Sequence, residues 1–292
     1  MSTDKLNHTM TQKAVHTREL SVAGAFGPLA RARIHRAAQC GTTVVVNFHG
    51  SFGHMEGSGG KYRLFAEVLS GQAGVHVALF ETSRLPGDFP EIPDPFLKRV
   101  AAFRGKTYAQ ELEDARRLLR TVVDGSLELF GVRGQELGIA LCGNSLGGFL
   151  CIALAAEFPQ VKWIAGAGVG IREMRPSDSH NNLAATLPER ASVESLAAGF
   201  RGAVLGAHGT LDDVFSREDF ARYMGAFSAA SARGACVYGG GDHSLSLAHG
   251  RPSPEPYTRF ARSLLRMLET GLPPSEEVEL MACLESQPEP RA

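Results

Sequence analysis

Short apolar runs alternate with amphipathic stretches along most of the chain. Residues 17–37 contain two alternating segments around a Gly-Pro pair, the pattern of two strands joined by a turn. Residues 42–50 are β-branched and apolar on both faces, as in a buried parallel strand, and further strands are predicted at 74–82, 137–145, 162–170, 201–213 and 234–244. Apolar positions at helical spacing predict helices at 62–72, 107–131, 146–158, 216–232 and 255–271.

This alternation predicts one α/β domain over residues 1–292, with a mainly parallel central sheet flanked by helices on both faces. Residues 83–96 are broken by prolines and are predicted to be a loop, which could form a wall of a pocket. Residues 171–201 are polar and irregular, and are predicted to be a short cap rather than a large apolar lid. The polar ends, residues 1–12 and 273–292, are predicted to be loose.

Charge and composition exclude several classes of protein. The chain has 30 basic and 31 acidic residues and no basic stripe, so no nucleic-acid partner is expected. Its start lacks an apolar signal region, and no stretch approaches the length of a membrane span. Five scattered cysteines without a CxxC pair favour reduced thiols and a cytoplasmic location. No spacing suggests a metal site, no cofactor is expected, and a homo-oligomer is left open.

The motif G-x-S-x-G in "LCGNSLGG" places Ser145 between Gly143 and Gly147, directly after a predicted strand. A sharp strand-to-helix turn needs glycines where Cβ atoms would clash, and it exposes the central hydroxyl above the sheet. The backbone N–H of Leu146 would then point to where an oxyanion forms. The alternative is a glycine-rich helix start with a capping serine.

Two further polar residues follow predicted strands at the same edge of the sheet. Asp212 follows the strand in "GAHGTLDDVF", and His243 follows the last predicted strand in "VYGGGDHS". A serine hydroxyl needs an adjacent base that a third group orients, and these residues occur in the order Ser, Asp, His. The sequence therefore predicts a catalytic triad of Ser145, Asp212 and His243.

Four stretches together resemble the α/β-hydrolase superfamily over residues 20–271, namely "NFHGSFG", "GNSLGG", "HGTLDDVF" and "GGGDHS". The resemblance is specific to the superfamily and to no one activity. It implies that Ser51, after the HG pair, donates the second oxyanion N–H, with Phe52 as a close rival and His49 as a structural ring. It also implies that Asp212 is the acid, because relatives read G-x-x-D-x-V, and that Asp213 is a solvated neighbour.

Other polar residues near the motifs have simpler interpretations. His54 and Glu56 are expected to order the glycine-rich loop, with the mouth of the site as the alternative. His208 is expected to be a packed histidine, Asp242 to hold the loop of His243, and Cys142 to be a small core residue.

The predicted activity is hydrolysis of an ester, thioester or amide of a small to medium acyl substrate through an acyl-enzyme. Phe52 and Asn144 are the expected substrate contacts. The alternatives are a biosynthetic thioesterase or acyltransferase, and a carbon–carbon bond hydrolase, which the "GNSLGG" elbow also resembles. A binding protein that uses the hydrolase fold without catalysis ranks below these, because all three triad residues are present.

Overall fold

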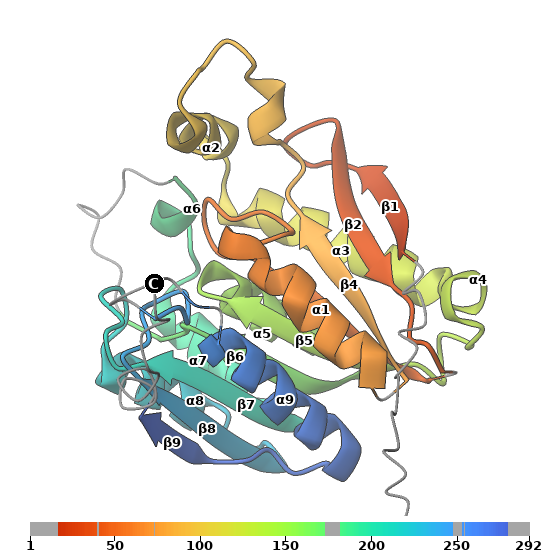
Figure 1. Ribbon diagram of the computed structural model, residues 1–292, viewed down its shortest axis with the longest axis vertical. Coiled ribbons are helices and arrows are strands. Elements are labelled where there is room, and N and C mark those ends of the chain that lie inside the picture. The colour runs from red at the N-terminus through yellow and green to blue at the C-terminus, as the bar shows by residue number, and fades with distance from the viewer. Residues whose placement is uncertain are drawn as a thin grey trace, which may run out of the picture.

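The computed structural model describes residues 17–39, 41–72, 74–172, 182–247, 253 and 255–279. In this part of the chain, nine strands form one sheet in the order β1-β2-β4-β3-β5-β6-β7-β8-β9 (Figure 1). The strands are β1 (Thr17–Ala23), β2 (Leu29–His35), β3 (Thr43–Phe48), β4 (Val75–Glu81), β5 (Gly138–Asn144), β6 (Val161–Ala167), β7 (Ala203–Gly209), β8 (Ala232–Gly239) and β9 (Glu276–Glu279). β2 pairs antiparallel with β1 and β4, and all other pairs are parallel. The predicted fold class is confirmed.

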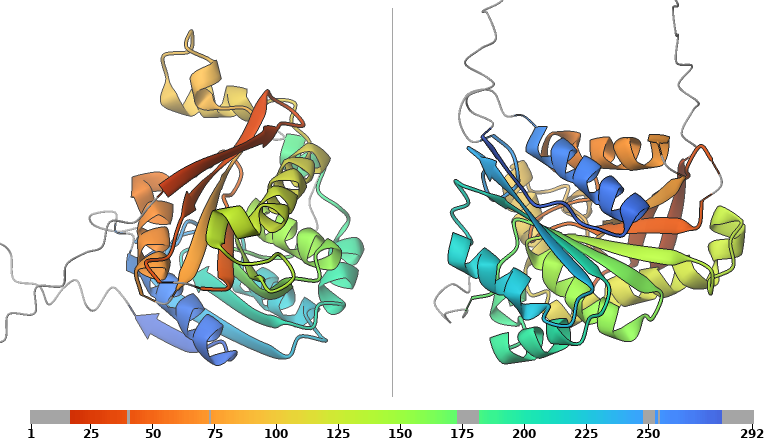
Figure 2. Two further views of the ribbon diagram at one scale, coloured as in Figure 1. Left: turned by 90° about the vertical axis from the view of Figure 1, so that its right-hand side faces the viewer. Right: turned by 90° about the horizontal axis from the view of Figure 1, so that it is seen from below.

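Helices cover both faces of this sheet (Figure 2). α1 and α9 lie on one face, and α3, α5, α7 and α8 lie on the other. The helices are α1 (Lys61–Gln72), α2 (Pro95–Phe103), α3 (Tyr108–Asp124), α4 (Ser126–Phe130), α5 (Leu146–Glu157), α6 (Asn182–Ala185), α7 (Arg190–Ala198), α8 (Arg217–Ala226) and α9 (Glu255–Thr270). None of these helices is long and apolar enough to cross a membrane.

Each face of the sheet has its own apolar core, which explains the continuous apolar runs in the sequence. Val44 and Val46 of β3 pack with the helices of the α5 side, whereas Val45 packs with α1 and α9. Successive side chains of a strand point to opposite faces, so a strand covered on both sides must be apolar at every position.

The structure corrects two predicted elements. Residues 107–131 form two helices instead of one, because α3 ends at Gly125 and α4 begins at Ser126. α2 was not predicted, since the prolines of the preceding loop obscured its start. It begins where the Asp94 carboxylate accepts the Leu97 N–H at 2.8 Å, and Pro95 occupies the first helical position.

The segments predicted to be a cap and a loose tail lie partly outside the described residues, which exclude 1–16, 173–181 and 280–292. In the cap segment, Val193 and Ala197 of α7 are buried in the same core as Leu150 of α5. α7 therefore covers the sheet like any other flanking helix. In the tail, β9 pairs parallel with β8, so residues 276–279 are not loose as predicted.

Candidate active site

The turn that carries Ser145 joins β5 directly to α5. Ser145 has φ 50° and ψ −114°, in the left-handed half of the backbone map that costs a non-glycine residue of order 1–3 kcal/mol. A Cβ on Gly143 would lie 2.3 Å from the Gly147 carbonyl, and a Cβ on Gly147 would lie 2.4 Å from the Phe48 oxygen. Both glycines of the motif are therefore required by close backbone approach.

Asp212 and His243 meet beyond the ends of β7 and β8. The His243 Nδ1 lies 3.0 Å from Asp212 Oδ1 and 3.1 Å from Oδ2, and the Asp212 side chain is fully buried. Asp212 Oδ1 also accepts the backbone N–H groups of Val214 and Phe215, each at 2.9 Å. Asp213 is exposed, so the structure brings Asp212, not its neighbour, to the histidine.

The environment of Asp212 keeps its carboxylate charged. Burial raises the pKa of Asp212, but the hydrogen bond from His243, the charge of that ring and the two backbone N–H groups lower it further than burial raises it. The net pKa of Asp212 is therefore below its ordinary value. An ionised, acceptor-only carboxylate holds the Nδ1–H tautomer of His243, which leaves Nε2 free to accept a proton.

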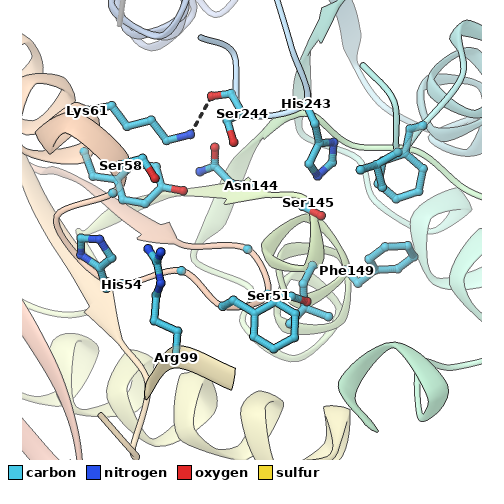
Figure 3. Close-up of a pocket in the computed structure, with 18 of the residues that line it drawn as sticks. Ser51, His54, Ser58, Lys61, Arg99, Asn144, Ser145, Phe149, His243 and Ser244 are labelled. Carbon is cyan, nitrogen blue, oxygen red and sulfur yellow. Dashed lines mark hydrogen bonds between the residues drawn. The ribbon is translucent and has the colours of Figure 1, made fainter. Parts of the chain in front are cut away.

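Ser145 and His243 open onto one pocket of about 410 Å³. The ring of His243 points toward Ser145 in this pocket (Figure 3). Leu146, Ser51 and Phe52 also line it. Leu146 is the first residue of α5, so its N–H has no acceptor within the helix.

The loop after β3 forms a tight turn beside this pocket. The Gly53 N–H donates to the Gly50 carbonyl at 3.0 Å, and Phe52 has φ 58°. The buried His49 ring donates its Nδ1–H to the same carbonyl at 2.9 Å, and its Nε2 lies 3.7 Å from Glu81 Oε1. His49 thus stabilises the turn through this hydrogen bond and does not line the pocket.

Three of the remaining predicted residues take up the roles expected of them. His208 is buried on β7 and stacks on Phe220 with ring centroids 5.1 Å apart. Asp242 accepts the N–H groups of Ser244 and Ser246, both at 2.8 Å, and so holds the loop of His243. Burial raises the pKa of the Cys142 thiol to about 12, so this thiol stays protonated in the core.

The surroundings of three other predicted residues, His54, Glu56 and Asn144, differ from one another. His54 lines the pocket, whereas Glu56 pairs with Arg33 and does not. Asn144 lines the pocket, but its Nδ2 donates to the Tyr257 hydroxyl at 2.9 Å and to Asn47 Oδ1 at 3.4 Å. Its amide is therefore already engaged in an internal network behind the elbow.

Most of the pocket wall was not predicted from the sequence. Its apolar side chains come from three separate places in the chain, namely Phe149, Leu187 and the adjacent Val214 and Phe215. Its basic side chains are Lys61, Arg99 and Arg172. A basic residue in an amphipathic helix looks like an ordinary exposed side chain, so no pattern in the sequence indicated these positions. Within the described residues, no group of three or more His, Cys, Asp or Glu side chains could hold a metal ion.

Comparison with protein-family models and with curated protein sequences found no match. Solved structures do resemble the chain. An esterase domain of a Rhodothermus marinus protein is 18% identical with a TM-score of 0.58, over 86% of this chain and 97% of that one. A putative dienelactone hydrolase from Klebsiella pneumoniae is 19% identical with a TM-score of 0.59, over 88% of this chain and 100% of that one. Est1E from Butyrivibrio proteoclasticus is 16% identical with a TM-score of 0.57, over 83% and 96%. The chain has the α/β-hydrolase fold.

Proposed function

We propose that this protein is a serine hydrolase that cleaves an ester bond of a small to medium acyl substrate. The observation that carries the proposal is the buried Asp212 carboxylate bonded to His243, whose ring faces the strained Ser145 in one pocket. The names of two of the similar structures, an esterase domain and a putative dienelactone hydrolase, support ester cleavage. A pocket of about 410 Å³ also suits a small substrate.

The mechanism follows from the chemistry of the three side chains. His243 Nε2 takes the hydroxyl proton as Ser145 Oγ attacks the ester carbonyl, and Asp212 stabilises the imidazolium that forms. The N–H groups of Leu146 and Ser51 bind the oxyanion, with Phe52 as the alternative second donor. The imidazolium then protonates the leaving alcohol, which leaves an acyl-enzyme on Ser145. Water, deprotonated by His243, attacks this acyl group and releases the acid and the free serine.

The test combines labelling with turnover. A fluorophosphonate probe is expected to label the wild-type protein at Ser145, because only an activated serine reacts fast with it. The same preparation should hydrolyse p-nitrophenyl butyrate. Ser145→Ala should abolish labelling and lower kcat at least about 10³-fold, since a triad nucleophile contributes far more than tenfold.

The matched control is Ser21→Ala, which removes an exposed hydroxyl on β1, outside the pocket. It should retain both labelling and turnover. A folded wild-type protein that neither reacts with the probe nor hydrolyses the ester would contradict the proposal and favour a binding protein with this fold. A panel of matched oxygen esters and thioesters then separates an esterase from a thioesterase.

A further inference from the structure

The charged side chains that line the pocket are all basic. Lys61, Arg99 and Arg172 line it, and none of its described lining residues is Asp or Glu. The whole chain is close to neutral, with a formal net charge of −1, so this bias does not reflect its composition. A cleft lined by one sign of charge concentrates ligands of the opposite sign.

Lys61 is the most deeply placed of these cations. The residue is only 5% exposed, and its amino group donates to the Ser244 carbonyl at 2.6 Å. The rings of Tyr62 and Tyr257 lie 5.1 and 5.0 Å from its nitrogen, and no carboxylate of a described residue pairs with it. An ammonium group has three donors, so the structure leaves hydrogen-bonding capacity on a buried charge that is costly without a partner.

Arg99 reaches the same side of the pocket from α2. Figure 3 shows its guanidinium pointing into the pocket near His54, on the side of Lys61 and across from Phe149. No hydrogen bond or ion pair joins Arg99 to another described residue. Burial lowers the pKa of His54, and the neighbouring His49 and Arg99 lower it further, whereas Glu56 raises it. The pKa of His54 is therefore below its ordinary value, which favours the neutral ring, and we assign the positive charge here to Lys61 and Arg99.

Apolar side chains also line the pocket, namely Phe149, Leu187, Val214 and Phe215. Figure 3 shows Phe149 on the opposite side of Ser145 from Lys61 and Arg99. The guanidinium of the third cation, Arg172, lies 5.6 Å from the centre of the Phe215 ring. Ser145 stands between a cationic wall and an apolar wall, so the two ends of a bound substrate meet opposite environments.

From this arrangement we propose that the ester substrate carries a carboxylate, which binds between Lys61 and Arg99 while its apolar part packs against the opposite wall. The proposal rests on the hydrolase function and names its substrate class. A carboxylate accepts charge-assisted hydrogen bonds from both cations and supplies the negative charge that the pocket wall lacks. Such a bond to a charged group contributes enough to change kcat/KM by about tenfold to a hundredfold.

The experiment compares esters that differ only in the presence of a carboxylate. On the acyl side the pair is mono-p-nitrophenyl adipate and p-nitrophenyl hexanoate, and on the alcohol side it is 4-butanoyloxybenzoate and its methyl ester. For at least one pair, the wild-type ratio of kcat/KM should favour the carboxylate by about tenfold or more. Arg99→Met should lower that ratio about tenfold, and intrinsic reactivity cancels because the same substrates are compared between variants.

Lys98→Met is the matched control. It removes one positive charge from the preceding position of α2, and Lys98 does not line the pocket. If the pocket binds the carboxylate through specific contacts, this control leaves the ratio within about twofold, because the half-buried Lys98 does not reach the pocket and salt screens its charge at that range. An equal effect of Lys98→Met and Arg99→Met would overturn the proposed contact.

A pH series tests Lys61 separately. Burial lowers its pKa to about 8, although the negative charge of Asp242 opposes this. Lys61 is therefore charged below about pH 8 and neutral above it, so the carboxylate preference should fall as pH rises through 8. Any pH dependence of the acylation step itself affects both esters of a pair and cancels in the ratio. The phenols of Tyr62 and Tyr257 stay neutral there, because burial raises their pKa values. Lys61→Met should give a lower ratio that does not change over this range.

Binding to Ser145→Ala separates this proposal from the proposed function. For the preferred pair, the non-hydrolysable acid should bind this variant more tightly than its uncharged partner. The amides are adipamate and hexanamide for the acyl side, and 4-butanamidobenzoate and its methyl ester for the alcohol side. The additional Arg99→Met substitution should remove the difference. If neutral esters are hydrolysed without any carboxylate preference, the substrate class is wrong and the hydrolase function stands. If no ester is hydrolysed while one of the acids is still preferred, the hydrolase function fails and the anion site stands.

Discussion

Replacing Asp212 with asparagine is expected to lower kcat about 10⁴-fold, the typical cost of holding a triad histidine in the wrong tautomer. Asp212 Oδ1 accepts the N–H groups of Val214 and Phe215 at 2.9 Å each. An asparagine keeps both bonds only if its oxygen takes the Oδ1 position. Its NH₂ group must then replace Oδ2, which lies 3.1 Å from His243 Nδ1.

That orientation disfavours the productive tautomer of the histidine. A proton on His243 Nδ1 could still bond the amide oxygen at 3.0 Å, but it would face the NH₂ hydrogens at 3.1 Å. The tautomer with its proton on Nε2 avoids this repulsion, and its Nε2 cannot take a proton from Ser145. Flipping the amide would break two backbone hydrogen bonds, at a net cost of about 0.5–1.5 kcal/mol each. This term alone disfavours the productive tautomer about 5- to 150-fold. The rest of the loss comes from the missing negative charge beside the imidazolium.

The assay is kcat on p-nitrophenyl butyrate, with thermal unfolding to confirm that each variant is folded. Asp213→Asn is the matched control, because Asp213 is exposed and adjacent in the chain, and its kcat should stay within about twofold. A kcat for Asp212→Asn within tenfold of the wild type would refute the reasoning. A larger loss for Asp213→Asn than for Asp212→Asn would move the acid by one residue.

The remaining predictions concern packing, buried charge and the acyl chain. Gly147→Ala should lower the free energy of unfolding by about 1–3 kcal/mol in denaturant unfolding, since its Cβ would lie 2.4 Å from the Phe48 oxygen. The control is Gly225→Ala on α8, whose Cβ would meet nothing within 4 Å and which should not lower the stability. Lys106→Met should lower the free energy of unfolding by about 3–5 kcal/mol, because it leaves the buried carboxylates of Glu111 and Asp114 without their cation. An unfolding midpoint equal to that of the wild type would contradict this. For p-nitrophenyl esters, kcat/KM should peak at short acyl chains. Each methylene that becomes buried contributes about 0.8 kcal/mol of binding free energy, and a pocket of about 410 Å³ has room for few of them. A profile that rises to long chains would show that a deeper apolar channel exists.

Local patterns were sufficient to predict the sheet and the turn at Ser145. Strands covered on both faces must be apolar throughout, and this leaves a signature in the sequence that needs no knowledge of the partners. The glycine spacing around Ser145 is local in part, because a Cβ on Gly143 would clash with Gly147, only four residues away. The clash of a Cβ on Gly147 is with the Phe48 oxygen, which the fold brings beside it. The sequence likewise placed Asp212 and His243 at the same edge, because parallel strands end on one side.

Other features required the assembled fold. The single helix predicted over residues 107–131 is interrupted at Gly125, where a Cβ would lie 2.9 Å from the Thr121 carbonyl. α2 begins inside a segment where prolines predicted only a loop. β9 is a strand because β8 offers it an open edge, and nothing in its own four residues indicates this. These elements depend on neighbours in space or on one residue's local contacts.

What the sequence by itself determined is the fold class and the identity of the three candidate triad residues, since both follow from spacing along the chain. What only the tertiary structure decided is the character of the pocket. Lys61 and Arg99 come from different helices, and neither differs in sequence from an ordinary exposed basic residue. They become a cationic wall only because α1 and α2 bring them to the same side of Ser145. Burial strengthens the electrostatic interaction of such charges with a ligand, and burial is a property of the packed chain.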